Sequence, residues 1–475
     1  MPQHSAGNVR DHSQKRHPRL PKAQARHSKD RKSAAVLQLL QDFESRNVTF
    51  VEPDGSWPIV WERARGVHVW DVEGKRYLDL TAAFGVAAAG HANPRVVAAG
   101  QKQMGRLLHA MGDVHPHELK ARLACELSRL TFERWNGTTR GKTIFCNSGF
   151  EAVETALKTA RLATGRRGII AFHGAYHGLG YGALNATHRP HFRSHFEDQL
   201  GGFGHFLPFP TVSLFAPAAQ NEKDPLKTLE SKLNRMFRRK NIGAVLVEPI
   251  QVRGGINIPP SDFLPLLRRL CNEHRALLIL DEIYTGFGRT GKWFACEYGK
   301  VAPDLICLGK ALTGGFPLSA CVGRADLMDA AWPPSNGEAI HTSTFLGHPV
   351  GCAMALAQIE EIKRRGLVTR SSPLGALLLR RLKSLSAKCS VLQCEARGLG
   401  LLAGLELRQR DGTPATQTTL HLVKMLLQRG FILLPEGEHA NVLGFTPPLT
   451  LSEAQIAATL RACEELLLQG KKGSA

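Results

Sequence analysis

Two short runs of aliphatic residues that each end in a charged side chain constrain the fold more than any other stretch of the sequence. The first run, ALLIL at 276–280, is followed by Asp281, and the second, PDLICL at 303–308, leads through Gly309 to Lys310. Their length and aliphatic character are typical of strands buried on both faces, as in a parallel sheet. Ligands of such sheets bind at the carboxyl ends of the strands. The sequence therefore predicts an α/β fold with a carboxylate and an amine at one binding edge.

A carboxylate and an amine at two such strand ends suit a ligand that has one cationic ring nitrogen and one reactive carbonyl. Pyridoxal phosphate has both groups, since an acid keeps its pyridine nitrogen protonated and a lysine condenses with its aldehyde. We therefore expect Asp281 and Lys310 to be catalytic residues. Each has an ordinary alternative, because a lysine after a strand is usually solvated and the Asp281-Glu282 pair is usual as a helix cap.

A candidate anion site lies where a strand runs directly into a helix. The strand GKTIFC at 141–146 breaks at Asn147-Ser148-Gly149, and apolar residues then recur at helical spacing from 151 to 162. The free N–H groups and the positive end of such a helix bind anions, and glycine lets a phosphate approach the backbone closely. Ser148 and Gly149 are therefore candidate phosphate ligands, with a simple helix cap as the alternative for Ser148.

The motifs DEIYTGFGRTG at 281–291 and PDLICLGKALTGGFPLSA at 303–320 resemble those of the class III (omega) aminotransferases, and the resemblance runs from about Val67 to the C-terminal region. It implies the fold type I of pyridoxal-phosphate-dependent transferases, an α/β fold with a mostly parallel sheet in a large domain and a smaller α+β domain. We expect a disordered basic tail at 1–35, a segment packing with the small domain at 36–90, the large domain at 91–345 and the small domain at 346–475.

The same resemblance assigns residues around the cofactor. Tyr176, in HGAYHG, matches the aromatic residue that stacks on one face of the pyridine ring, and Ile283 matches the residue that covers the other face. Phe150 follows the phosphate-binding Gly149 at a position that usually holds a small residue. Tyr284 replaces a glutamine, so a hydrogen bond from this position to the ring hydroxyl stays an open question.

The segment HTSTFLGHPVG at 341–351 carries the expectation about assembly. Thr344 matches a threonine that crosses a dimer interface to the cofactor phosphate of the partner. On its own, TSTF carries no information. Through the resemblance, it implies a homodimer with composite active sites.

Three residues are candidates for the substrate side of the site. Phe84, in TAAFGVAAAGHANP, matches a rim position that faces substrate, and a plain core position is its alternative. Glu248 ends another predicted strand on the same edge as Asp281, where it either contacts a ligand directly or holds neighbouring loops. Arg253 stands where the family often has a glutamate.

Arg253 is of interest because two arginines that bind substrate carboxylates in the family are absent. Their positions hold Leu179 and Gly444. In carboxylate-handling relatives, the glutamate matching Arg253 pairs with the arginine matching Gly444. A guanidinium left without its carboxylate could bind a substrate carboxylate or phosphate bidentately, so we expect Arg253 to be a substrate residue. The alternative is that Arg253 points into solvent or pairs with an acid such as Glu248.

The formal net charge of +20 is partly local. Residues 1–33 hold nine Lys and Arg against two Asp, so nine minus two gives +7 and leaves +13 elsewhere. This stretch has too few large apolar residues to fold and no aromatic interleaving, so nucleic-acid binding is not expected. Its Arg-rich, acid-poor character also resembles an organellar transit peptide, although its Asp and His residues and the lack of an apolar face argue against that alternative.

Other patterns bound the location and the kinds of ligand. No apolar run approaches the roughly 18 residues that span a bilayer, and the N-terminus lacks the apolar core of a signal peptide, so we expect a cytoplasmic protein without a membrane partner. The ten cysteines lack paired spacing, and there is no CxxC or His-rich pattern, so no metal site is expected.

These observations predict a class III aminotransferase that uses pyridoxal 5'-phosphate to move an amino group between an amine or omega-amino acid and a 2-oxo acid. Aminomutase or phospho-lyase chemistry on the same fold stays open as an alternative. A third hypothesis is a catalytically idle carrier or nucleic-acid-binding protein that uses the basic surface.

Overall fold

The computed structural model describes residues 31–213, 215 and 225–468. The chain divides into two compact units, Met1–Glu62 with Trp70–Lys75 and Arg63–Val69 with Arg76–Ala475. Strands β1 (Trp61–Arg65) and β2 (His68–Asp71) span the division between these units.

The first unit contains helix α1 (Arg31–Phe43). The backbone N–H and the hydroxyl of Ser33 donate to the carboxylate of Glu73 at 2.9 and 2.6 Å, which fixes the first turn of the helix. The predicted disordered tail at 1–35 lies mostly outside the described residues. The prediction of disorder was wrong for residues 31–35, because they form the start of α1 and the bonds of Ser33 to Glu73 hold this turn in place.

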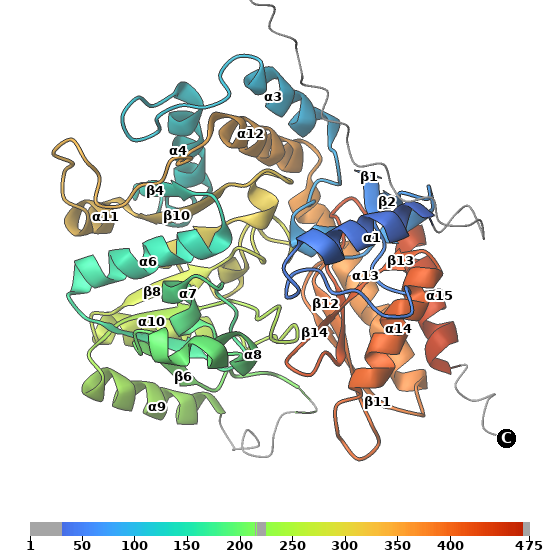
Figure 1. Cartoon of the computed structure of the whole chain (residues 1–475). Coiled ribbons are helices and arrows are strands. Elements are labelled where there is room, and N and C mark those ends of the chain that lie inside the picture. The colour runs from blue at the N-terminus through green and yellow to red at the C-terminus, as the bar shows by residue number, and fades with distance from the viewer. Residues whose placement is uncertain (1–30, 214, 216–224, 469–475) are drawn as a thin grey trace, which may run out of the picture. The chain divides into compact units, whose positions relative to one another are not determined.

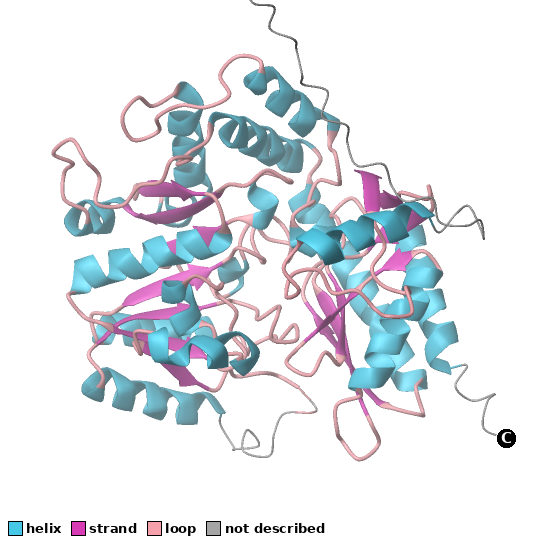
Figure 2. Ribbon diagram, in the orientation of Figure 1, coloured by secondary structure: helices cyan, strands magenta, loops and turns pink. Residues whose placement is uncertain are grey.

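The second unit is built on a seven-stranded sheet in the order β4-β10-β9-β8-β7-β5-β6 (Figures 1 and 2). The pairs β6/β5, β5/β7, β7/β8 and β8/β9 are parallel, whereas β10 is antiparallel to both β4 and β9. The mostly parallel sheet is therefore as predicted. Its strands are β4 (Gly141–Cys146), β5 (Gly168–Phe172), β6 (Gly204–Leu207), β7 (Ile242–Val247), β8 (Leu277–Asp281), β9 (Leu305–Leu308) and β10 (Ser319–Arg324).

Helices cover both faces of this sheet, which explains why its strands are aliphatic throughout. Alternate residues of β5, β7 and β9 pack in one buried cluster against α6 (Gly149–Thr164), the helix predicted at 151–162. Phe172 of β5 points to the other face, where its ring lies 5.3 Å from that of Phe263 in α10 (Phe263–Glu273). The parallel strands thus bring their carboxyl ends to one edge.

The C-terminal part forms a smaller α+β layer, as predicted. Its antiparallel sheet has the order β11-β12-β15-β14, and β13 pairs in parallel with β3. The elements are β3 (Arg76–Asp79), α12 (Pro349–Arg364), α13 (Leu367–Lys388), β11 (Gln393–Gly398), β12 (Ala403–Arg408), α14 (Thr416–Gln428), β13 (Phe431–Ile432), β14 (Leu434–Glu436), β15 (Val442–Phe445) and α15 (Glu453–Leu468). The remaining α-helices are α2 (Ala82–Gly85), α3 (Pro94–Met104), α4 (Glu118–Leu130), α5 (Phe132–Asn136), α7 (Tyr181–Ala186), α8 (Pro190–Arg193), α9 (Pro225–Arg239) and α11 (Ala325–Ala331).

A buried arginine fastens the C-terminal sheet to the loop that follows β7. Arg397 of β11 is 7% exposed, and its Nη1 lies 2.6 Å from Oε2 of Glu406. Its Nη2 donates to the carbonyl of Gly255 at 2.6 Å, and its Nε donates to the carbonyl of Ile256 at 3.0 Å. Because these groups are withdrawn from water, each depends on the others for hydrogen bonds.

Replacing Arg397 with methionine should destabilise the protein by about 3 kcal/mol, because the carbonyls of Gly255 and Ile256 would lose their donor and Glu406 would keep Arg408 as its remaining described charged partner. The measurement is the free energy of unfolding in urea, with Arg381→Met on the exposed face of α13 as the control. We expect the control to stay within about 0.5 kcal/mol of the wild type. Equal effects of the two substitutions would contradict the fastening role of Arg397.

Candidate functional site

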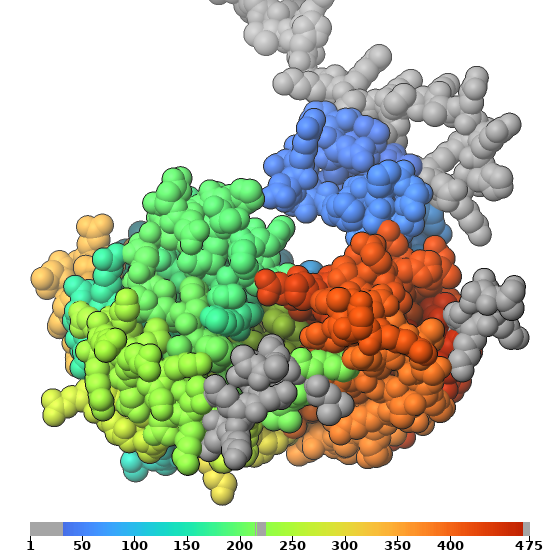
Figure 3. Space-filling view, turned by 90° about the horizontal axis from the view of Figure 1, so that it is seen from below, coloured from blue at the N-terminus to red at the C-terminus, as the bar shows by residue number. Residues whose placement is uncertain are grey.

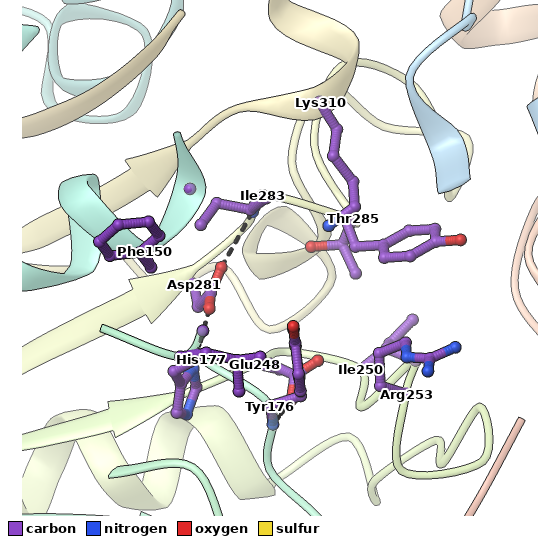
Figure 4. Close-up of a pocket in the computed structure, with 14 residues that line it drawn as sticks. Phe150, Tyr176, His177, Glu248, Ile250, Arg253, Asp281, Ile283, Thr285 and Lys310 are labelled. Carbon is purple, nitrogen blue, oxygen red and sulfur yellow. Dashed lines mark hydrogen bonds and ion pairs between the residues drawn. The ribbon is translucent and has the colours of Figure 1, made fainter. Parts of the chain in front are cut away.

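A cavity of about 430 Å³ lies in the second unit at the carboxyl ends of β7, β8 and β9. Its walls come from five segments: the start of α6 and the residues that follow β5, β7, β8 and β9. The space-filling view shows this unit hollowed between its green segments and its orange and red segments (Figure 3). Figure 4 shows side chains from these segments converging on one space.

Asp281 is held in place at the end of β8 by two hydrogen bonds. Its Oδ1 accepts from the N–H of Ile283 at 3.1 Å, and its Oδ2 lies 2.8 Å from Nδ1 of His177 (Figure 4). Both side chains are buried, and Nε2 of His177 has no hydrogen-bond partner among the described residues. The sequence motifs did not mark His177 as a site residue. The signal was its place after β5, which ends at the same edge as β8.

Lys310 follows β9 and reaches into the cavity (Figure 4). Its backbone has φ 38°, in the left-handed region that residues other than glycine seldom adopt. Such strained residues are often found in active sites, where the surrounding structure holds them in one conformation. Its Nζ lies 4.6 Å from the centre of the Tyr284 ring. Burial lowers the pKa of Lys310, although Asp281 and Glu248 oppose the effect. Lowering the pKa makes the neutral, nucleophilic amine more accessible.

The N-terminus of α6 has the features of an anion site. The carboxylate of Glu151 accepts from the N–H groups of Asn147 and Ser148 at 2.7 and 2.8 Å, but Oγ of Ser148 is buried and has no partner in the described structure. Gly149 lets Ile283 pack closely against the start of the helix, since a Cβ at 149 would lie 3.0 Å from Cδ1 of Ile283. An orphaned hydroxyl beside a sixteen-residue helix fits the phosphate predicted for this position.

Two aromatic residues of the site are fixed by their neighbours. The ring of Tyr176 packs edge to face against Phe192, with 5.4 Å between the ring centres. The hydroxyl of Tyr284 lies 3.3 Å from Oγ1 of Thr446, and burial raises the pKa of Tyr284. Phe150 is 39% exposed and lies at the cavity wall beside Ile283 (Figure 4).

Glu248 holds two loops of the site together. Its carboxylate accepts from the N–H of Tyr176 at 3.1 Å and from the N–H of Val252 at 3.3 Å. Burial raises the pKa of Glu248 to about 7. Of the two roles considered from the sequence, these bonds give it the structural one, while its place at the cavity wall leaves a contact with a ligand as a prediction.

Arg253 has a carboxylate partner that the sequence did not reveal. Its Nη1 lies 2.9 Å from Oε2 of Glu436, whose side chain is only 4% exposed. The premise that Arg253 lacks a carboxylate was therefore wrong, and the partner is Glu436 of β14 instead of Glu248. The two residues are far apart in the sequence, and their segments are joined by the N–H of Gly437, which donates to the carbonyl of Arg253 at 3.2 Å.

Three predicted residues do not line this cavity: Ser148, which lies beside it next to Gly149, Phe84 and Thr344. Phe84 is 53% exposed and has φ 61° in a left-handed turn, so the core alternative for it is wrong and its contact with substrate stays a prediction. Thr344 is exposed, as is Phe345 beside it, so its predicted role across a dimer interface also stays a prediction.

The described residues also bear on metal ions and membranes. The described residues contain no group of three or more His, Cys, Asp and Glu side chains arranged to hold a metal ion. Within the same residues, every helix is too short or too polar to cross a membrane.

Comparisons with known proteins agree on one family. A family model described as "Aminotransferase class-III" matches residues 50–467. The chain is 37% identical over 413 residues to the 5-aminovalerate aminotransferase DavT of Pseudomonas aeruginosa, covering 86% of this chain and 93% of that protein. It is also 37% identical over 423 residues to the putrescine aminotransferase of Pectobacterium atrosepticum, covering 88% and 84%.

A similar solved structure is an amine transaminase from an uncultivated Pseudomonas species in its PLP-bound form. The TM-score is 0.80 at 28% sequence identity, and the match covers 90% of this chain and 98% of that chain.

Replacing Glu248 with glutamine should make stability less dependent on pH between about 4.5 and 7. Because folding raises this pKa from 4.5 to about 7, the folded chain holds the proton more tightly than the unfolded chain. The free energy of unfolding of the wild type therefore falls as pH rises through this window. The pKa of Glu248 differs by about 2.5 units between the two states, 7 minus 4.5, which corresponds to a loss of about 3 kcal/mol in the free energy of unfolding across this pH window.

Between pH 4.5 and pH 7.5, the free energy of unfolding of Glu248→Gln should rise by about 3 kcal/mol relative to that of the wild type. The measurement is urea unfolding of the cofactor-free protein. The lost hydrogen bond adds an offset that does not depend on pH. A constant difference between the two proteins across the range would contradict the raised pKa.

Proposed function

Because the chain belongs to the class III aminotransferases and has the fold type I of pyridoxal-phosphate-dependent transferases, we propose that pyridoxal 5'-phosphate is its cofactor and that Lys310 and Asp281 carry its chemistry. The enzyme moves an amino group between an amine or omega-amino acid and a 2-oxo acid. Both relatives named above are aminotransferases, which favours transfer over the aminomutase and phospho-lyase alternatives.

The residues of the cavity fit this cofactor. Ser148 and Gly149 at the N-terminus of α6 would hold its phosphate. The buried hydroxyl of Ser148 has no hydrogen-bond partner among the described residues and could bond to that phosphate. Tyr176 and Ile283 would cover the two faces of its ring, and Phe150 would lie beside it. When bound, the cofactor supplies an aldehyde that accepts the amino group and a protonated ring that withdraws electrons from the reacting carbon.

The buried amine of Lys310 is the single observation that carries the proposal. A neutral amine can take a proton from the substrate carbon and return it, and the lowered pKa of Lys310 favours that form. Asp281 would hold the proton of the ring nitrogen, and His177 and the Ile283 N–H orient its carboxylate for this task. The ring of Tyr284 packs against the Lys310 amine, and the hydroxyl of Tyr284 lies near Thr446. Because that hydroxyl already has a neighbour, Tyr284 has a place in the site without a bond to the cofactor.

The substrate would enter from the side of the cavity where Arg253 lies. The relatives are named for 5-aminovalerate and putrescine, an omega-amino acid and a diamine, and we propose donors of this length for the present enzyme. Arg253 lies across the cavity from Phe150, so its guanidinium would meet the tail of a substrate whose other end reacts beside Lys310 (Figure 4). Phe84 and Glu248 are proposed to complete the substrate side.

We also propose a homodimer in which Thr344 contacts the cofactor phosphate of the partner. Support comes from exposed apolar side chains that would otherwise face water. They occur in one segment, at Met104, Leu107, Leu108, Met111 and Val114, and again at Phe345, whose ring packs 5.3 Å from that of His109. A cytoplasmic location is proposed on the ten free cysteines, which are usual in a reducing compartment.

Lys310→Ala should lose turnover by about a thousandfold or more and still bind the cofactor, because phosphate binding and ring stacking do not need the amine. The measurement is carbonyl product formed from an omega-amino acid, with and without a 2-oxo acid. Without the acceptor, the wild type should release about one equivalent per site, since a transaminase keeps the amino group. Continued turnover without acceptor would indicate a lyase.

Lys383→Ala, on the exposed face of α13, is the matched control and should keep full activity. Retained multiple turnover in Lys310→Ala would overturn the assignment of Lys310.

Two inactive variants should complement each other if the sites are composite. Lys310→Ala lacks the amine, and Thr344→Glu places a carboxylate where the partner's phosphate is expected. In a mixed dimer, one site has both residues intact, so random reassembly should restore about one quarter of the wild-type activity. Co-purification of differently tagged subunits demonstrates exchange. Exchange without recovery, from a Thr344→Glu protein that is itself impaired, would contradict the composite site.

A further inference from the structure

Three segments meet around Arg253, which lines the cavity. They are the stretch leading into α8, the loop after β7, and the end of β14 with the turn that follows it. The N–H of Gly437 donates to the carbonyl of Arg253 at 3.2 Å, and Nη2 of Arg189 lies 3.5 Å from the carbonyl of Gly437. Gly437 thus contacts both segments, through the backbone of Arg253 and the guanidinium of Arg189.

The absence of a side chain at Gly444 makes room for the side chain of Glu436. A Cβ built on Gly444 would lie 3.0 Å from Cγ of Glu436, so the space that a side chain at 444 would fill is taken by Glu436. Glu436 is buried and bonded to Arg253 at 2.9 Å. Burial raises the pKa of Glu436 to about 7, and Arg253, Arg189 and Lys310 all act against that rise. Glu436 is therefore the counter-charge of a cationic cluster.

Arg189 is the least satisfied member of this cluster. It is half-buried, and its Nε is shielded from water and has no hydrogen-bond partner among the described residues. Its guanidinium stacks 5.3 Å from the centre of Phe192, the ring that packs against Tyr176 at the cavity wall. Burial and the charge of Arg253 both lower the pKa of Arg189.

The charges around these guanidiniums do not balance inside the protein. Glu436 is the one buried carboxylate that is described next to both arginines, since Glu438, which also acts on Arg189, is exposed and solvated. Two guanidiniums that repel each other and share one carboxylate gain from a second anion. The position of Arg253 at the cavity wall means that a substrate can supply it.

We propose that Arg189 and Arg253 together bind the distal carboxylate of the substrate, and that Glu436 holds the two guanidiniums when that carboxylate is absent. The substrates would be an omega-amino acid as donor and a dicarboxylic 2-oxo acid as acceptor, because both carry a carboxylate several carbons from the reacting atom. The inference rests on the proposed function and makes Arg189 a determinant of specificity that the sequence motifs do not mark.

The first test is equilibrium binding of glutarate, a five-carbon dicarboxylate that cannot react, to the holoenzyme by calorimetry. Arg189→Met should weaken glutarate binding by about ten- to a hundredfold, the scale of a lost charge-assisted bond. Arg189→Lys should recover part of the affinity, since it keeps the charge without the planar donor pair. Arg238→Met, an equal change of charge on the exposed face of α9, should bind as the wild type does.

The second test compares 2-oxoglutarate with 2-oxopentanoate, in which a methyl group replaces the distal carboxylate. Arg189→Met should raise KM for 2-oxoglutarate by about ten- to a hundredfold and leave KM for 2-oxopentanoate within about threefold. In the double variant with Arg253→Met, the two effects should fall short of their product, because both arginines hold the same group.

The outcomes separate this inference from the proposed function. Transamination by a protein whose glutarate affinity and KM values do not respond to Arg189→Met would overturn the inference alone. Glutarate binding that depends on Arg189, in a protein that never transfers an amino group, would overturn the proposed function and leave the anion site. An equal rise of KM for both 2-oxo acids would mean that Arg189 only supports the fold, and tighter binding of diamines through Glu436 would assign the tail site to ammonium groups.

Discussion

The parallel hydrogen bonding of β7, β8 and β9 is the constraint on which the site depends. Val247 pairs with Leu280 and Asp281 pairs with Cys307, so the three strands end almost level at one edge. A charged residue lies at or just beyond the end of each strand: Glu248, Asp281 and Lys310. The backbone ladder thus brings an amine and two carboxylates, from points dispersed along the chain, to the wall of one cavity before any side chain makes a specific contact.

The parts of this arrangement that the sequence predicted are those written in local patterns. The buried strands, the helix after Gly149 and the charged residues at strand ends follow from periodicity and from abrupt changes of polarity within a few residues. Fold class and family were therefore readable, and the comparisons confirm them. The partner of Arg253 was not readable, because Glu436 lies in a short strand with no distinctive pattern, and only the pairing of β14 with β15 sets its position. His177 was missed for a similar reason, since nothing local to it shows that Asp281 is 2.8 Å away.

Buried carboxylates in and around the site lower the free energy of unfolding at neutral pH. Burial raises the pKa of Glu248 and Glu436 to about 7 and that of Glu282 to about 6. Such shifts mean that the folded chain resists ionising these groups, so the surrounding aliphatic sheet and the bonds of Arg397 must offset the cost. Enzymes commonly hold unfavourable charges where they bind ligands, and a rigid two-sided core makes this tolerable.

The contact between Gly444 and Glu436 makes the order of sequence changes matter. With 3.0 Å between a would-be Cβ and a side chain that is buried and ion-paired, even alanine at 444 requires Glu436 to move. A longer side chain at 444 would need more of the space that Glu436 now fills. The two positions are therefore coupled, and the effect of a substitution at 444 depends on which side chain stands at 436.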